Sequence, residues 1–125
     1  MTEKRKYQRF ACKIKAKIDY YPGNPDEIDL DISVPKKIKG LIMDASKGGA
    51  FVVTNERVTV GSPVRINFTT KKSKYSVVGH IVRIGLLRNN PSEDAVRLEK
   101  FADKGDSYMA VEFSEPLETL NEDEL

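Results

Sequence analysis

The sequence predicts a single all-β domain, an antiparallel barrel or sandwich. Three observations support this prediction. The length of 125 residues suits one domain with one core. Apolar and polar residues alternate in several short runs, and turn-forming residues recur about every ten positions between those runs.

The clearest alternation predicts the first strand. Apolar side chains occupy every second position of residues 10–20, and lysines or an aspartate lie between most of them. A period of two is typical of a strand with one face buried and the other in water. The three lysines of this strand are Lys13, Lys15 and Lys17. Cys12 lies on the apolar face, so we expect it to belong to the core rather than to a reactive site.

Five further strands follow from similar patterns. We expect them at residues 38–43, 50–54, 64–68, 75–84 and 108–113. Gly61-Ser62-Pro63 and Lys71–Lys74 are turn signals between neighbouring strands. The prolines and glycine of residues 21–25 end the first strand, and the acidic stretch 26–35 is compatible with a loop or a short edge strand.

Two segments depart from the strand pattern. Ser92 is a candidate N-cap for a short helix within residues 92–103, inside an insertion that spans residues 86–107. Residues 115–125 are compatible with a C-terminal helix or with a disordered tail. The chain therefore divides into a flexible basic arm (residues 1–9), a barrel (10–114) and an acidic tail (115–125).

The charge is distributed unevenly along the chain. The net charge is only +2, but residues 1–22 hold seven basic and two acidic side chains, and the last fourteen residues hold six acidic side chains and no basic one. This asymmetry indicates either a site for an anion near the N-terminus or two solvated ends. No apolar run approaches the roughly 18 residues that a membrane span requires. With one cysteine and one histidine, we expect neither an internal disulfide nor a zinc site.

The first candidate binding motif is Arg5-x-x-x-Arg9, directly before the first strand. A guanidinium presents a planar fork of donors that fits phosphate oxygens or the O6 and N7 atoms of guanine, and its plane stacks on bases. Two such groups four residues apart suit a flat anionic ligand. A solvated basic segment remains the alternative.

The second candidate motif is Asp44-Ala45-Ser46-Lys47-Gly48-Gly49, between two predicted strands. Asp44 and Ser46 favour a tight turn, because their side chains accept hydrogen bonds from nearby backbone N–H groups. We expect the two glycines to supply positive φ angles and a close backbone approach. The turn either binds a ligand, with Asp44 accepting from a guanine, or serves only as a turn.

Together, the two motifs resemble those of the PilZ domain, the bacterial receptor module for cyclic di-GMP. The family's Arg-x-x-x-Arg opens a β-barrel, and its Asp-x-Ser-x-x-Gly follows about 35 residues later, as here. The strands after the second motif also resemble those of the family, notably residues 79–83 and 109–113. The similarity extends over residues 4–114, with Ala110 where the family usually has glycine. It implies that the domain is an antiparallel barrel of the PilZ type, with six or seven strands, rather than a sandwich.

The resemblance also implies the site. Arg5 and Arg9 would bind guanine edges and phosphates, Asp44 and Ser46 would bind a second guanine, and Gly49 would keep the turn open. Secondary candidates are Lys4, Gly48 and Arg83. Lys4 stands where many members have a further arginine, and it keeps the charge but loses the bidentate fork.

The implied function is a cytoplasmic bacterial adaptor without resident cofactor or metal. It would bind cyclic di-GMP, change conformation and signal through an unidentified effector protein in motility, biofilm or polysaccharide control. No side chain pairs a nucleophile with a base, and His80 lies among alternating strand residues, so we expect no enzymatic activity.

Two alternatives remain open. The lysines of the first strand, with Lys71–Lys74, would suit a barrel that binds single-stranded nucleic acid, although exposed aromatic residues are scarce and no nucleic acid polymer is expected as the partner. The domain would otherwise be a PilZ-like protein-interaction module that binds no ligand.

Overall fold

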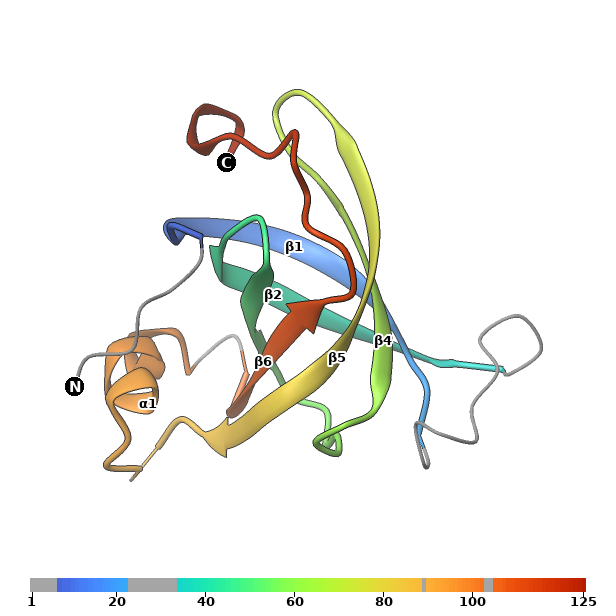
Figure 1. Ribbon diagram of the computed structural model, residues 1–125. Coiled ribbons are helices and arrows are strands. Elements are labelled where there is room, and N and C mark those ends of the chain that lie inside the picture. Colours follow the sequence, from blue (N-terminus) through green and yellow to red (C-terminus); the bar gives the residue numbers. More distant parts are fainter. Residues whose placement is uncertain (1–6, 23–33, 89, 103–104) are drawn as a thin grey trace.

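A computed structural model describes residues 7–22, 34–88, 90–102 and 105–125. Six antiparallel strands close into a barrel in the order β1-β2-β3-β6-β5-β4 (Figure 1). The predicted all-β barrel is confirmed. The predicted basic arm falls mostly on residues 1–6, which lie outside the described residues, as do residues 23–25 of the predicted turn and 26–33 of the acidic stretch.

The strands occupy the predicted segments with small extensions. They are β1 (Phe10–Tyr20), β2 (Lys36–Ala45), β3 (Gly49–Thr54), β4 (Pro63–Thr69), β5 (Lys74–Leu86) and β6 (Ser107–Phe113). One extension affects the candidate site. Because β2 continues past Met43 to Ala45, Asp44 lies on the strand rather than in the turn after it.

The interior of the barrel is the larger of two hydrophobic clusters. The alternation on β1 places Ala16, Ile18 and Tyr20 in this interior, while Lys13, Lys15 and Lys17 are exposed. Full burial of an aliphatic side chain such as Ile18 contributes about 1.5–3 kcal/mol to the free energy of unfolding. Cys12 is half-buried against this cluster, as predicted.

The second cluster lies on the outer face of β2, β3 and β6. It includes Leu41 and Met43 of β2 and Phe51 of β3, together with Ala95 and Leu98 of the insertion. Helix α1 (Glu93–Leu98) covers this face (Figure 1). Because β2 is buried on both faces here, its residues from Leu41 to Ala45 are buried in succession and do not alternate.

The insertion forms the short helix that the sequence predicts. Ser92 caps α1 by accepting a hydrogen bond from the backbone N–H of Ala95 at 3.2 Å. A 3₁₀ turn, η2 (Glu99–Phe101), continues the helix toward β6. Among the described residues, the helices are too short and too polar to span a membrane.

The C-terminal segment folds against the hairpin of β4 and β5. It ends in a 3₁₀ turn, η3 (Glu122–Glu124), and Leu120 and Glu124 are buried. The Glu124 carboxylate accepts hydrogen bonds from Thr70 at 2.7 Å and from Tyr75 at 2.8 Å. Neither alternative for residues 115–125 is observed: the segment is ordered, but its helical part is only the three-residue turn η3.

Candidate ligand-binding site

Four residues form one row across the outer face of the barrel. Asp44 of β2 is opposite Phe51 of β3, Phe51 is opposite Ala110 of β6, and Ala110 is opposite Arg83 of β5. Directly opposite residues of neighbouring strands have side chains on the same face. The small Ala110 side chain separates Phe51 from Arg83, which leaves room for the longer arginine to reach the ring.

The ring of Phe51 is the centre of this surface. Three guanidinium carbons lie over it, those of Arg9 at 4.5 Å, Arg97 at 5.2 Å and Arg83 at 5.4 Å from the ring centroid. Contacts of this kind contribute about 0.5–1 kcal/mol each at exposed sites. Phe51 is only 3% exposed, so its ring is a buried platform that holds three cations together.

Two aspartates join these arginines into a chain of alternating charge. The Oδ1 atom of Asp44 lies 3.9 Å from Nε of Arg9, and its Oδ2 atom accepts a hydrogen bond from Nη1 of Arg97 at 2.8 Å. Asp94 accepts from Nη2 of Arg97 at 3.2 Å and pairs with Arg83. Three positive and two negative charges leave this network attractive to anions.

The Asp44 carboxylate has an unsatisfied acceptor. Its side chain is 7% exposed, and no described donor is hydrogen-bonded to Oδ1. Buried carboxylate oxygens nearly always have donors in folded proteins. Arg9 neutralises this oxygen at a distance too long for a hydrogen bond, so Oδ1 is suited to receive an N–H group from a ligand.

The turn after β2 is held by its own backbone and by Ser46. The Ser46 N–H donates to the Gly49 carbonyl at 2.9 Å, and the Ser46 hydroxyl accepts from the Gly48 N–H at 3.1 Å. The expectation of positive φ angles at Gly48 and Gly49 is wrong, because only Gly61 adopts one among the described glycines, at 93°.

Gly48 and Gly49 instead allow neighbouring groups to approach the backbone of the turn closely. A Cβ atom on Gly49 would lie 2.4 Å from the Val111 carbonyl oxygen, and one on Gly48 would lie 2.8 Å from the ring of Tyr7. The Tyr7 ring therefore packs on Gly48, and Arg9 lies over Phe51. The segment that precedes β1 thus passes beside the turn.

The structure brings most of the predicted site residues to one surface. Arg9 and Asp44 are close to each other, and Gly48 and Gly49 belong to the adjoining turn with Ser46. The secondary candidate Arg83 also reaches this surface. Lys4 and Arg5 lie outside the described residues.

Three further residues of this surface are absent from the sequence prediction. Phe51 is a buried residue of the second cluster, and its ring also lies beneath the arginines. Arg97 and Asp94 come from α1, and Arg97 is 53 positions from Asp44. Their one local signal is the spacing of Asp94 and Arg97, which places an ion pair on one face of the predicted helix.

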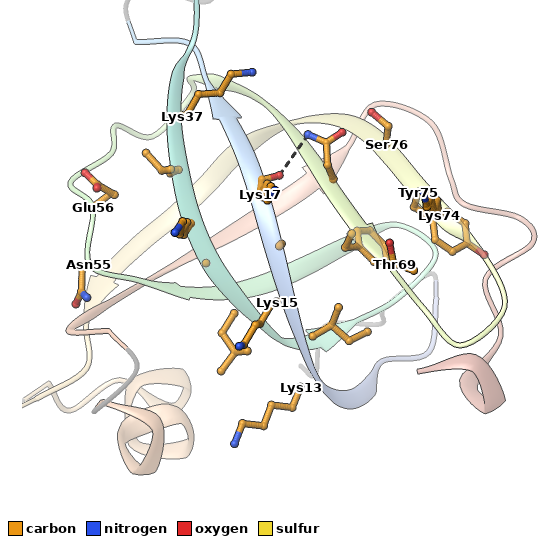
Figure 2. A pocket seen from close by; sticks show the side chains of 18 residues that line it. Lys13, Lys15, Lys17, Lys37, Asn55, Glu56, Thr69, Lys74, Tyr75 and Ser76 are labelled. Atoms are coloured by element: carbon orange, nitrogen blue, oxygen red, sulfur yellow. Dashed lines mark hydrogen bonds between the residues drawn. The ribbon is translucent and has the colours of Figure 1, made fainter.

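A separate basic hollow lies on the outer face of β1 (Figure 2). Lys13, Lys15 and Lys17 line it from β1. Lys37 and Lys39 of β2 and Lys74 of β5 complete its lysine lining. Lys37 is paired with Asp19 at 2.6 Å. The lysines of this basic hollow form part of the surface that binding of single-stranded nucleic acid would require.

The closed barrel that carries Asp44 and the Ser-x-Gly-Gly turn is the arrangement expected of a PilZ-type domain. The PilZ domain family model matches residues 3–125, and the chain belongs to this family. No curated protein sequence gives a match.

Two solved structures have a similar fold. The Bacillus subtilis inhibitor of motility (MotI/DgrA) matches with a TM-score of 0.58 and 19% identity, over 92% of this chain and 44% of that one. The PilZ domain of YcgR from Escherichia coli, solved with c-di-GMP, matches with a TM-score of 0.55 and 10% identity, over 90% of this chain and 79% of that one. This chain thus spans less than half of the Bacillus protein.

Proposed function

We propose that this domain is a receptor for cyclic di-GMP that binds the ligand beside Asp44 and Phe51 and transmits its occupancy to an effector protein. The observation that carries the proposal is the buried Asp44 carboxylate with an unsatisfied oxygen, next to arginines gathered on one aromatic ring. Membership of the PilZ family supports it, as does the fold shared with a YcgR domain solved with c-di-GMP.

The chemistry of the site matches both parts of this ligand. A guanine offers the N1–H and N2–H donors side by side, and a carboxylate accepts two parallel donors. The two phosphates carry negative charge and planar sets of oxygens, which guanidinium groups bind in pairs. Asp44 would accept from one guanine while Arg9 binds a phosphate or stacks on a base.

The N-terminal arm would complete the site. The Tyr7 ring lies on Gly48, so the chain enters β1 beside the turn. We expect Arg5 to bind the ligand together with Arg9 and the arm to become ordered over the barrel, which changes the surface offered to an effector. Control of motility fits the similarity in fold to an inhibitor of motility.

Isothermal titration calorimetry with cyclic di-GMP tests this function. We expect saturable binding to the unmodified domain and at least about tenfold weaker binding to R5A and R9A, which is about 1.4 kcal/mol or more for each. R88A is a matched control, because Arg88 is exposed on the insertion. Unchanged affinity in both R5A and R9A would contradict the proposed site, and absence of binding would favour the protein-interaction module.

The basic hollow supports a second candidate function, binding of single-stranded nucleic acid. Its six lysines would track a phosphate backbone, and affinity would then fall steeply as salt rises. A gel shift with a long oligonucleotide at low and moderate salt distinguishes the two functions. Binding that disappears when Lys13, Lys15 and Lys17 are all changed to Gln would favour this candidate, and no shift at low salt would exclude it.

A further inference from the structure

Arg97 of helix α1 is hydrogen-bonded to Asp44, the carboxylate that the proposed ligand requires. Its Nη1 atom donates to Asp44 Oδ2 at 2.8 Å, and its Nη2 atom donates to Asp94 Oδ1 at 3.2 Å. Its guanidinium also lies 5.2 Å from the centroid of the Phe51 ring. One side chain therefore joins the insertion to the barrel through two contacts, those with Asp44 and Phe51, while its bond to Asp94 lies within α1.

A guanine and Arg97 compete for the same oxygen. The paired N–H donors of a guanine would use both oxygens of Asp44, and Oδ2 already accepts from Arg97, which leaves that oxygen one further acceptor position. Because the Asp44 side chain is only 7% exposed, there is little room for both partners around it. Arg97 is 41% exposed, so its own charge can turn outward into water, and the guanine donors would take its place at the buried carboxylate.

Loss of this contact would weaken the hold of the barrel on α1. The helix has six residues, and it buries only Ala95 and Leu98. Its charged contacts with the strands are Arg97–Asp44 and Asp94–Arg83, and both lie at the surface around Phe51. A helix this short depends on its tertiary contacts for stability. The stability of α1 therefore depends on whether Asp44 is bound to Arg97.

We propose that Arg97 is a latch residue: it holds the Asp44 carboxylate until a guanine displaces it, and its release loosens α1 from the barrel. This inference rests on the proposed function and identifies α1 as the element that moves when the ligand binds. The insertion then carries the signal, because α1 and the outer faces of β2, β3 and β6 become available to an effector when the helix loosens.

Two measurements on the unmodified domain, R97A and R88A test the latch. Calorimetry with cyclic di-GMP gives the affinities, and hydrogen exchange followed by mass spectrometry reports the opening of residues 92–101. We expect R97A to bind roughly three- to tenfold more tightly, because the competitor is gone and a half-exposed ion pair is worth about 1 kcal/mol. We expect the ligand to increase exchange in residues 92–101 of the unmodified domain.

Exchange in R97A should be raised before ligand is added and should change little afterwards, while R88A should behave like the unmodified domain. Weaker ligand binding by R97A, or protection of residues 92–101 by the ligand, would overturn the latch and leave the receptor function intact. Absence of binding to both the unmodified domain and R97A would overturn the receptor function and the latch together. Thermal unfolding of each variant checks that the barrel is folded.

Discussion

The Asp44 carboxylate of β2 and the Arg97 guanidinium of α1 are hydrogen-bonded at 2.8 Å, although 53 positions separate them in the sequence. The pair connects the predicted binding motif to the insertion, the part of the chain whose role the motifs leave open. In the proposed latch, a guanine would displace this contact, because both would use the Oδ2 atom of Asp44.

The substitution D44N tests the role of the buried carboxylate. We expect at least about tenfold weaker binding of cyclic di-GMP, because one acceptor oxygen is replaced by an amide that faces the guanine donors. Calorimetry measures the loss. D19N is the matched control, because Asp19 is on β1 and pairs with Lys37 away from the site. Equal affinity in D44N and the unmodified domain would place the ligand elsewhere.

The substitution Phe51→Leu distinguishes the contribution of Phe51 to packing from its contribution to holding the arginines. Leucine keeps most of the buried volume, so we expect about 1 kcal/mol of lost stability, against about 3–5 kcal/mol for Phe51→Ala. The ring face beneath the three arginines is lost, and we expect roughly two- to tenfold weaker ligand binding. Urea unfolding and calorimetry measure the two effects. Binding by F51L at the unmodified affinity would show that the arginines need no platform.

Gly49→Ala tests the close approach of β3 to β6. The added Cβ would lie 2.4 Å from the Val111 carbonyl oxygen, which is backbone and cannot turn aside. We expect a loss of about 1–3 kcal/mol in the free energy of unfolding. Gly48→Ala is the matched comparison, because it meets the ring of Tyr7, which can move. Equal stability of the two variants would contradict this difference.

The thiol of Cys12 gives a pH-dependent readout. Burial, and then the charge of Asp44, raise the pKa of Cys12 from 9.0 to about 11. Iodoacetamide should therefore alkylate it with a rate that rises toward pH 11. Unfolded chains lose this proton first, so the cysteine contributes stability below pH 9 that is lost as pH rises toward 11. Alkylation with a midpoint near pH 9 would contradict the burial.

Local periodicity was sufficient to predict the strands, and the resemblance to the PilZ domain predicted their closure into a barrel. Residues 10–20 alternate because one face of β1 meets the interior and the other meets water, and the turn residues separate the strands. The same reasoning placed the end of β2 too early. Asp44 and Ala45 remain in the strand because both are still paired with β1 and β3, and pairing with another strand leaves no trace in the local pattern.

The residues of the candidate site also fall into those that local sequence predicts and those that depend on distant contacts. Arg9, Asp44 and Ser46 belong to two short motifs with fixed spacing, and the sequence predicted them. Phe51 and Arg97 act through contacts across strands and with α1, which depend on the order of strands around the barrel. That order joins β3 to β6 and therefore brings the insertion before β6 onto the outer face of β2 and β3.

The most direct test of the binding site is a titration of the ¹⁵N-labelled domain with cyclic di-GMP, followed by NMR of the backbone amides. We predict the largest changes in amide chemical shift at residues 7–9, 44–51, 83 and 94–97, with small changes along the lysines of β1. Changes concentrated at Lys13, Lys15 and Lys17, with residues 44–51 unaffected, would contradict this prediction.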